Sequence, residues 1–140
     1  MRIDIFEYCI TLPLKPYTCI PIVEHEVREA LRMAPPDKAP GEDGMSNRIL
    51  KAAAKELIPI YMVLFNKSIQ LKYCPTRFKK SITVALRKPG KDDYSQPKSY
   101  RPVALMNTIG KVLDTILARR VQYYAERYHM LPSIYTGGRK

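Results

Sequence analysis

The sequence has few of the residues that build disulfide frameworks and zinc sites. Its three cysteines, Cys9, Cys19 and Cys74, form an odd number without a C-x-x-C pair, and its only histidines are His25 and His129. A disulfide framework needs paired cysteines, and a zinc site needs cysteine or histidine ligands at close spacing. We therefore expect neither disulfides nor a bound metal, and the default expectation is a reduced, intracellular protein of the nucleus or cytoplasm.

Long uninterrupted hydrophobic runs are also missing. The apolar N-terminal stretch, residues 1–22, is broken by Asp4, by Glu7 and by three prolines. A secretory signal or a membrane-spanning helix needs a continuous apolar segment, so we expect neither of them and no membrane partner. Internal repeats and low-complexity tracts are absent as well.

Acidic residues are scarce relative to basic ones. The chain has 24 Lys and Arg against 13 Asp and Glu, which gives a net charge of +11. The excess is concentrated, because residues 72–101 carry nine cations and two anions. A localised basic segment favours a polyanionic partner such as nucleic acid, whereas a basic surface that only maintains solubility is the alternative. The apolar share of 46% indicates a folded chain.

The first half of the chain is typical of helices separated by one loop. Residues 22–33 have apolar positions at helical spacing, and the three prolines and two glycines of residues 34–44 predict a structured loop. Residues 45–57 predict a helix capped by Ser46, and Pro59 is expected in the first turn of the helix that follows. The apolar face expected for that following helix contains Ile60, Leu64 and Ile69, flanked by Tyr61 and Phe65.

The second half predicts a β-hairpin and a long helix. Residues 81–88 alternate apolar and polar positions, residues 100–107 form a second such run, and Pro102 is expected at a strand start or edge. Residues 108–128 carry an apolar stripe at i, i+3, i+4 and i+7 spacing, which predicts the long helix. A loop without a closing element is expected to follow it. The fold class is therefore α+β, mostly helical with one hairpin.

An ordered set of motifs resembles a known family. The sequence contains K-A-P-G-x-D-G at residues 38–44, K-P-G-K at 88–91, S-Y-R-P-V-x-L at 99–105 and G-K-V-x-D at 110–114. Their order and spacing resemble the N-terminal portion of reverse transcriptases from non-LTR (LINE-like) retrotransposons. The resemblance implies that residues 21–140 form a partial reverse transcriptase domain, namely the fingers of a right-hand polymerase and the first edge of the palm. Residues 1–20 are an unassigned extension.

The resemblance also implies site residues and partners. Lys88 and Arg101 are expected to bind the nucleoside triphosphate, because cations from two neighbouring strands can converge on it. Lys38, Pro40 and Gly41 are expected at the RNA template, so an RNA template or RNA/DNA hybrid and a dNTP are the expected partners. By contrast, we expect Asp43 to act as a cap or turn acceptor.

Carboxylates are missing where this family places its catalytic ones. Nucleotidyl transfer uses two metal ions held by aspartates, and the family has these in palm motifs downstream of the matched region. Here the last aspartate is Asp114, so we expect a chain truncated before the palm active site, with no catalytic residue and no cofactor, although the full-length family uses magnesium. The resulting prediction is an inactive polymerase fragment that retains template and nucleotide binding.

Two further possibilities depend on the same truncation. The chain is alternatively a non-catalytic module, derived from a transposon remnant, that binds nucleic acid or a protein. If the helix of residues 108–128 normally packs on a palm that is absent, its apolar stripe is exposed, and self-association through this face is expected.

Overall fold

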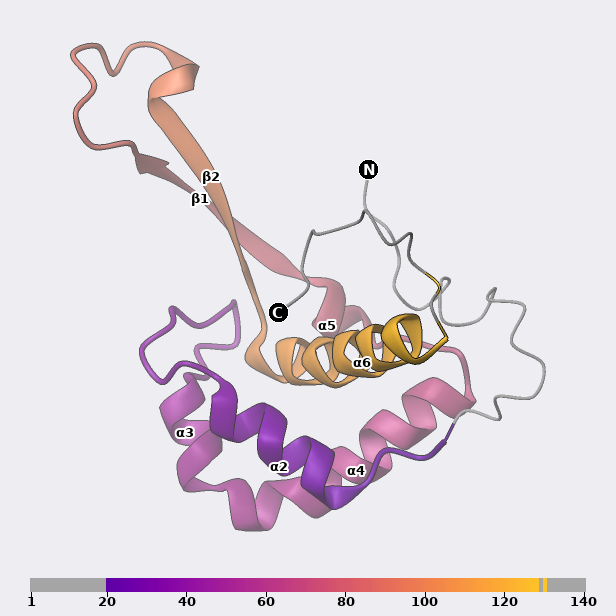
Figure 1. Ribbon diagram of the computed structural model, residues 1–140. Helices are drawn as coiled ribbons and strands as arrows, with labels where there is room; N and C mark the ends of the chain where they lie inside the picture. Colours follow the sequence, from indigo (N-terminus) through magenta and orange to yellow (C-terminus); the bar gives the residue numbers. More distant parts are fainter. Residues whose placement is uncertain (1–19, 129, 131–140) are drawn as a thin grey trace.

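The computed structural model describes residues 20–128 and residue 130, and shows a helical body from which one hairpin projects (Figure 1). The expectations for residues 1–19 and for the loop of residues 131–140 lie outside these described residues. The elements are α2 (Glu24–Met33), α3 (Asn47–Ala52), α4 (Ala54–Gln70), α5 (Thr76–Lys79), β1 (Ser81–Arg87), η1 (Pro97–Ser99), β2 (Tyr100–Met106) and α6 (Thr108–Arg127). The predicted α+β class, mostly helical with one antiparallel hairpin, is confirmed.

Helix α6 forms part of the core of the body together with α2 and α4. Its buried apolar residues are Val112, Leu113, Ile116 and Leu117. They belong to the same buried cluster as Val27, Ala30 and Leu31 of α2. The expectation that this stripe is exposed is therefore wrong for its central part, because the helices of this chain already cover it, whereas self-association stays a prediction.

The junction between α3 and α4 differs from the expectation. Helix α3 begins after Ser46, whose Oγ accepts a hydrogen bond from the Ile49 N–H at 3.5 Å, so the predicted cap is confirmed. The break comes at Ala53, and Pro59 consequently lies inside α4 instead of in its first turn. A proline inside a helix removes the hydrogen bond to the carbonyl of the residue four positions earlier, which here is Lys55. Pro59 and Lys55 are both exposed, so water can satisfy that carbonyl and the proline is tolerated.

The buried face of α4 is also rotated from the predicted one. Ile58, Tyr61 and Phe65 are buried, whereas Ile60 is 59% exposed. Tyr61 and Phe65 stack with ring centroids 5.6 Å apart, which confirms that these aromatic residues pack in the core. Of the predicted face, Leu64 and Ile69 are half-buried against the core and only Ile60 lies outside it, because helical spacing alone did not show which side of α4 meets α2.

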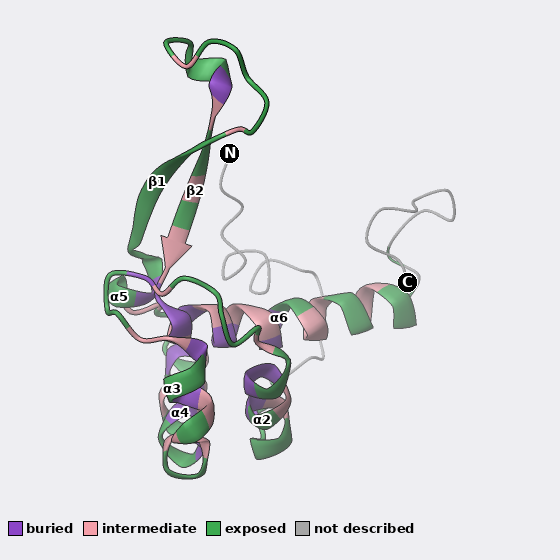
Figure 2. Cartoon of the chain, turned by 90° about the vertical axis from the view of Figure 1, so that its left-hand side faces the viewer, coloured by how far each residue is buried: buried purple, intermediate pink, exposed green. Residues whose placement is uncertain are grey.

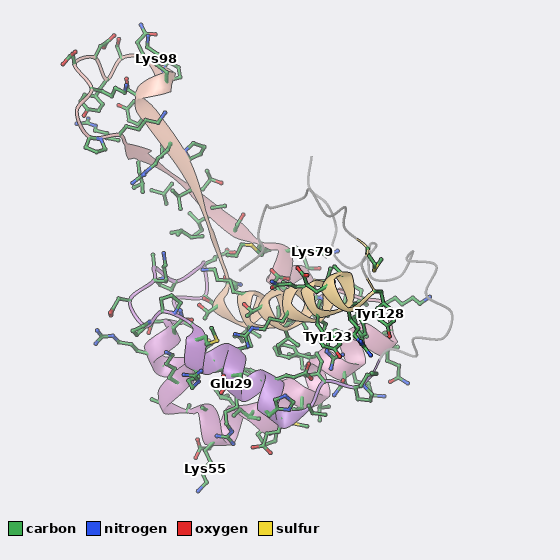
Figure 3. All side chains as sticks on the ribbon, viewed as in Figure 1. Glu29, Lys55, Lys79, Lys98, Tyr123 and Tyr128 are labelled. Atoms are coloured by element: carbon green, nitrogen blue, oxygen red, sulfur yellow. The ribbon has the colours of Figure 1, made fainter. Side chains whose placement is uncertain are left out.

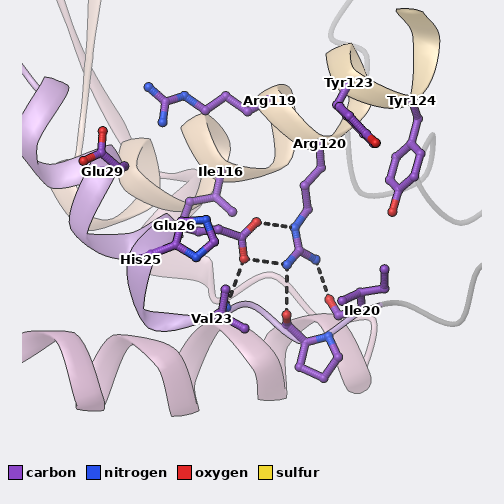
Figure 4. A pocket seen from close by; sticks show the side chains of 11 residues that line it. Ile20, Val23, His25, Glu26, Glu29, Ile116, Arg119, Arg120, Tyr123 and Tyr124 are labelled. Atoms are coloured by element: carbon purple, nitrogen blue, oxygen red, sulfur yellow. Dashed lines mark hydrogen bonds and ion pairs between the residues drawn. The ribbon is translucent and has the colours of Figure 1, made fainter. Parts of the chain in front are cut away.

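A half-buried ion pair fastens the start of the described chain to α6 (Figure 4). The Arg120 guanidinium donates to both carboxylate oxygens of Glu26 at 2.7 Å and to the Pro21 carbonyl at 3.0 Å. The Ile20 carbonyl accepts a further hydrogen bond from Arg120. Beside this pair is a cavity of about 570 Å³ between residues 20–23, α2 and α6. Arg120 thus holds three chain segments together.

The hairpin is a two-stranded sheet that stands clear of the helices. Its register pairs Ser81 with Met106 beside the body and Arg87 with Tyr100 at the far end. Every residue of β1 is exposed, as the green strand in Figure 2 shows. The Lys88 N–H donates to the Ser99 carbonyl at 2.8 Å, so the ladder extends one residue beyond β1.

Pro102 occupies a permissive position in this ladder. In an antiparallel ladder, hydrogen-bonded residue pairs alternate with pairs that exchange no hydrogen bonds. Lys88 and Ser99 form a hydrogen-bonded pair, so the pair of Ala85 and Pro102, three positions along the ladder, exchanges none. The nitrogen of Pro102 therefore faces outward from the two-stranded sheet, where its missing N–H leaves no partner unsatisfied. The expectation of an edge position is confirmed, although Pro102 is the third residue of β2 and not its first.

Candidate nucleic-acid interface

Apart from Lys72, which lies just after the end of α4, the cations of the basic segment fall into two groups at opposite ends of the hairpin. The first group surrounds the hairpin tip, which Lys98 marks in Figure 3, and the second lies at the hairpin base, where Lys79 is labelled beside α6. The tip group consists of Arg87, Lys88, Lys91, Lys98 and Arg101. The base group consists of Arg77, Lys79 and Lys80. Seven-residue strands separate the two groups by about 20 Å.

The tip loop, residues 88–99, is held by its own hydrogen bonds. The Tyr94 hydroxyl donates to the Lys88 carbonyl at 2.9 Å, and the Ser99 hydroxyl donates to the Asp93 carbonyl. Asp93 Oδ1 accepts from the Ser95 N–H at 2.8 Å. Hydrogen bonds from the Ser95 side chain and backbone hold the pKa of Asp93 below its usual value. The loop therefore presents its cations from an ordered structure.

Aromatic rings pack beneath these cations. The Arg87 guanidinium lies 5.2 Å from the centroid of the Tyr94 ring, and Tyr94 meets Tyr100 edge to face at 6.2 Å. A cation over a tyrosine ring is attracted by the negative face of the ring. Because Tyr94 comes from the loop and Tyr100 from β2, this cluster fixes the loop against the strand.

Lys88 and Arg101 lie on the same face of the hairpin. Arg101 is opposite Leu86, and Lys88 is two residues beyond Leu86 in the extended ladder. Residues two apart in a strand share a face, so both side chains start from the same side. The Lys88 ammonium donates to the Lys98 carbonyl at 2.9 Å, whereas Arg101 is exposed. Both residues flank the hairpin tip and lie far from its base.

The predicted template residues lie at the opposite end of the hairpin. The backbone of Gly41 is so close to the β2–α6 junction that a β-carbon there would lie 2.4 Å from Asn107 Oδ1 and 2.7 Å from the Met106 carbonyl carbon. Gly41 is buried, Pro40 is half-buried and Lys38 is exposed. The structure therefore separates these residues from Lys88 and Arg101 by the length of the strands.

Asp43 has the structural role that the sequence predicts. Its carboxylate accepts a hydrogen bond from the Met45 N–H at 3.1 Å, directly before α3. Gly44, with φ +66°, completes the turn by donating its N–H to the Gly41 carbonyl at 3.2 Å. The interpretation of Asp43 as a turn acceptor is confirmed.

Asn107 and Thr108 are structural residues that the sequence analysis did not identify. Buried Asn107 donates its side-chain amide to the Arg77 carbonyl at 3.0 Å and accepts from the Asp43 N–H at 3.4 Å. The Thr108 hydroxyl donates to the Met45 carbonyl at 2.6 Å. Together they join the loop of residues 38–44, α5 and the start of α6. A polar residue that follows a strand is common, so no sequence signal distinguished this pair.

The described residues contain neither a metal cluster nor a membrane-spanning helix. No group of three or more His, Cys, Asp or Glu side chains within residues 20–128 and 130 is arranged to hold a metal ion. Over the same residues, the helices are too short or too polar to cross a bilayer.

Comparison with known proteins identifies relatives. The chain is 30% identical over 131 residues to the probable RNA-directed DNA polymerase from transposon BS of Drosophila melanogaster, covering 94% of this chain and 14% of the relative. It is 32% identical over 128 residues to the probable RNA-directed DNA polymerase from transposon X-element of Drosophila melanogaster, covering 91% of this chain and 13% of the relative.

A third relative shows the same relationship. The chain is 29% identical over 119 residues to the RNA-directed DNA polymerase from mobile element jockey of Drosophila funebris, covering 85% of this chain and 13% of the relative. No protein-family model matches the chain. The chain thus spans about 14% of the length of the curated relatives it matches. Over most of its length, it belongs to the family of RNA-directed DNA polymerases from non-LTR retrotransposons.

Proposed function

We propose that the chain is the fingers portion of an RNA-directed DNA polymerase, and that its hairpin tip binds phosphates of the RNA template or RNA/DNA hybrid and of the incoming dNTP. The concentration of positive charge at the tip carries this proposal. Five cations lie on or beside the tip loop against only Asp92 and Asp93. Within the described residues, no ion pair neutralises these five cations.

Arg101 and Lys88 are the two residues on which the triphosphate contact depends. Arg presents a planar fork that matches two phosphate oxygens, and Lys supplies a point charge on a flexible stem. Their shared face allows both to approach one phosphate chain, with the Lys88 ammonium exchanging its bond to the Lys98 carbonyl for a phosphate oxygen. Lys38 forms a separate template contact near the hairpin base, and Pro40 and Gly41 shape the loop that carries it.

The test is the salt dependence of RNA binding. Binding of a labelled single-stranded RNA is measured by fluorescence anisotropy at several salt concentrations, for the wild type and for the double variant Lys88→Ala and Arg101→Ala. The slope of log K against log salt is negative, and each lost phosphate contact reduces its magnitude by about 0.7. The slope of the double variant is therefore expected to be less steep by about 1.4. Titration with a dNTP is expected to show weaker binding in the same variant.

A matched control distinguishes the effect of the tip cations from that of lowering the net charge of the chain. The double variant Lys55→Ala and Lys67→Ala removes the same charge from exposed positions of α4, and Figure 3 shows Lys55 far from the hairpin. We expect it to retain the wild-type slope. Equal losses in both double variants, or an unchanged slope in the tip variant, would place the binding surface elsewhere.

A further inference from the structure

The hairpin carries an apolar row on the face that also holds Lys88 and Arg101. Ile82, Val84 and Leu86 of β1 are 45%, 37% and 42% exposed. The register places half-buried Leu105 and Val103 opposite Ile82 and Val84 on the same face. Large aliphatic side chains on a strand are ordinarily covered by a second layer, but neither strand packs extensively on any described helix.

The other face of the hairpin is different in character. It carries Ser81, Thr83, Ala85 and Arg87 on β1, and on β2 the opposite residues Met106, Ala104, Pro102 and Tyr100, so it lacks a continuous aliphatic row. A two-stranded hairpin in water is marginally stable unless one face is covered by a further element. The face with the row of Ile82, Val84 and Leu86 is therefore the one that a covering layer would stabilise.

Cations stand at both ends of the apolar row. Lys80 has an extended backbone immediately before β1, so it shares the face of Ile82, and Lys88 shares the face of Leu86. The eight steps from Lys80 to Lys88 span about 27 Å. A complementary partner therefore has an apolar centre and an acidic group near each end.

This pattern fits a polypeptide better than a nucleic acid. A polynucleotide presents a phosphate at every nucleotide, and single-strand binders place cations and aromatic rings side by side along its path. Between Lys80 and Lys88, this face carries only Ile82, Val84 and Leu86 on β1, and its one cation on β2 is Arg101, opposite Leu86 at the tip end. The aliphatic side chains at the centre of the row offer nothing to a phosphate backbone.

A second copy of the chain is disfavoured by charge. The chain has a net charge of +11. If two hairpins stacked face to face, each lysine at the end of one row would meet Lys80 or Lys88 of the other copy, and like charges in contact repel. The partner must therefore carry the opposite charge.

We propose that this face docks an amphipathic helix of another polypeptide, whose apolar stripe is flanked by acidic residues at both ends. A helix presents an apolar stripe at i, i+4 and i+7 spacing and packs on the face of a sheet as a second layer. Acidic groups that match Lys80 and Lys88 lie about 18 residues apart in such a helix. The docking face goes beyond the proposed phosphate binding, which uses Lys88 and Arg101 at the tip end of the same face, whereas Lys80 and the aliphatic row serve only the docking.

The probe is a designed, fluorescein-labelled helical peptide of about 20 residues, with a leucine stripe at this spacing and glutamates at both ends. Its binding to the full chain is followed by fluorescence anisotropy. We expect saturable binding that weakens as salt is added. A peptide with lysines in place of the glutamates is expected to bind at least tenfold more weakly.

The decisive variant replaces Ile82, Val84 and Leu86 with threonine. Threonine keeps the β-propensity and the charge, so the fold and the RNA binding of the tip are expected to remain, whereas peptide affinity falls at least tenfold. The matched control is Ala85→Thr on the opposite face, which we expect to leave peptide affinity unchanged. Circular dichroism checks that both variants fold.

Other outcomes overturn the proposal. Absence of peptide binding, or equal losses in the threonine variant and in Ala85→Thr, excludes this docking face. Sedimentation that shows a dimer in the wild type and a monomer in the threonine variant identifies a second copy as the occupant. Binding to anionic phosphatidylserine vesicles that the threonine variant loses identifies a lipid surface. Failure of RNA binding with peptide binding intact contradicts only the proposed function.

Discussion

Gly41 has no space for a side chain, because its backbone lies against Asn107 and Met106. We therefore expect Gly41→Ala to destabilise the chain by about 1–3 kcal/mol, since the added carbon must push apart the 38–44 loop and the β2–α6 junction. Urea unfolding followed by circular dichroism measures the change. The control is Gly44→Asn, at a position with φ +66° and open space, where asparagine tolerates the left-handed backbone. Equal effects of the two substitutions would contradict the proposed clash.

The Glu26–Arg120 pair predicts a pH dependence of stability. Partial burial raises the pKa of Glu26, but the hydrogen bonds from Arg120 and from the Val23 N–H outweigh this effect and leave the pKa below the usual 4.5. A carboxylate with a lowered folded-state pKa stabilises the fold above its unfolded pKa and loses this contribution as the pH falls through the folded value. The contribution of Glu26 is therefore expected to be complete at pH 7 and to disappear below about pH 4.5.

Glu26→Gln tests this prediction. At pH 7 the variant is expected to be less stable than the wild type by about 1–2 kcal/mol, because glutamine cannot satisfy the charged guanidinium equally well. The difference in unfolding free energy between wild type and variant should shrink towards pH 3. A difference that stays constant from pH 7 to pH 3 would show that the charge of Glu26 contributes nothing.

Individual residues were predictable to the extent that their partners are local in sequence. Ser46 caps α3 and Asp43 accepts from the backbone two residues later, and both interactions follow from residue type and position. Asn107 and Arg120 bond to groups 64 and 94 residues away, respectively. Such partners depend on how the helices pack, so no local pattern indicated them.

At the scale of single elements, α4 ends in a motif that contains a strained residue. The Tyr73 N–H donates to the Ser68 carbonyl at 2.9 Å, and the Lys72 N–H donates to the Ile69 carbonyl at 3.0 Å, which together form a Schellman C-cap. Lys72 has φ 52°, a left-handed conformation that costs a residue with a β-carbon roughly 1–2 kcal/mol.

Lys72→Gly is therefore expected to stabilise the chain by about 1 kcal/mol, because glycine adopts this conformation without a steric penalty. Thermal unfolding followed by circular dichroism measures the rise in Tm. The control is Lys67→Gly in the last turns of α4, where the backbone is right-handed, and it is expected to cost about 1 kcal/mol. A lower Tm for Lys72→Gly would show that the lysine side chain has a stabilising contact that outweighs the strain.

Element types followed from the sequence more readily than element boundaries. The strands were predicted from alternation and α6 from its long apolar period, and both are confirmed. The α3–α4 break at Ala53 was missed, because alanine is a strong helix former and only the packing of both helices requires a turn there.

At the scale of the whole molecule, the surroundings of the described aspartates bear on whether the chain can polymerise alone. Two-metal nucleotidyl transfer needs aspartates that converge on the metal ions. Asp37 is paired with Arg48, Asp43 is engaged in a turn and Asp93 in the tip loop. We therefore expect the purified chain to extend no primer on an RNA template with dNTPs and Mg²⁺ or Mn²⁺.

A denaturing gel of labelled primers measures this outcome. A purified retroviral reverse transcriptase, run in parallel, establishes that the template and primer are competent. Primer extension by the chain that is abolished by Asp114→Asn would contradict the expectation and would identify a catalytic carboxylate within these 140 residues.

The sequence by itself determined the family, the α+β class, the hairpin and the concentration of positive charge in residues 72–101. These properties depend on motif order, periodicity and composition, all of which can be read along the chain. Only the tertiary structure decided that Lys38 and the pair of Lys88 and Arg101 lie at opposite ends of the hairpin, and that the central stripe of α6 is covered. Strand register and helix packing join residues far apart in sequence, and their outcome depends on which apolar surfaces bury each other most completely.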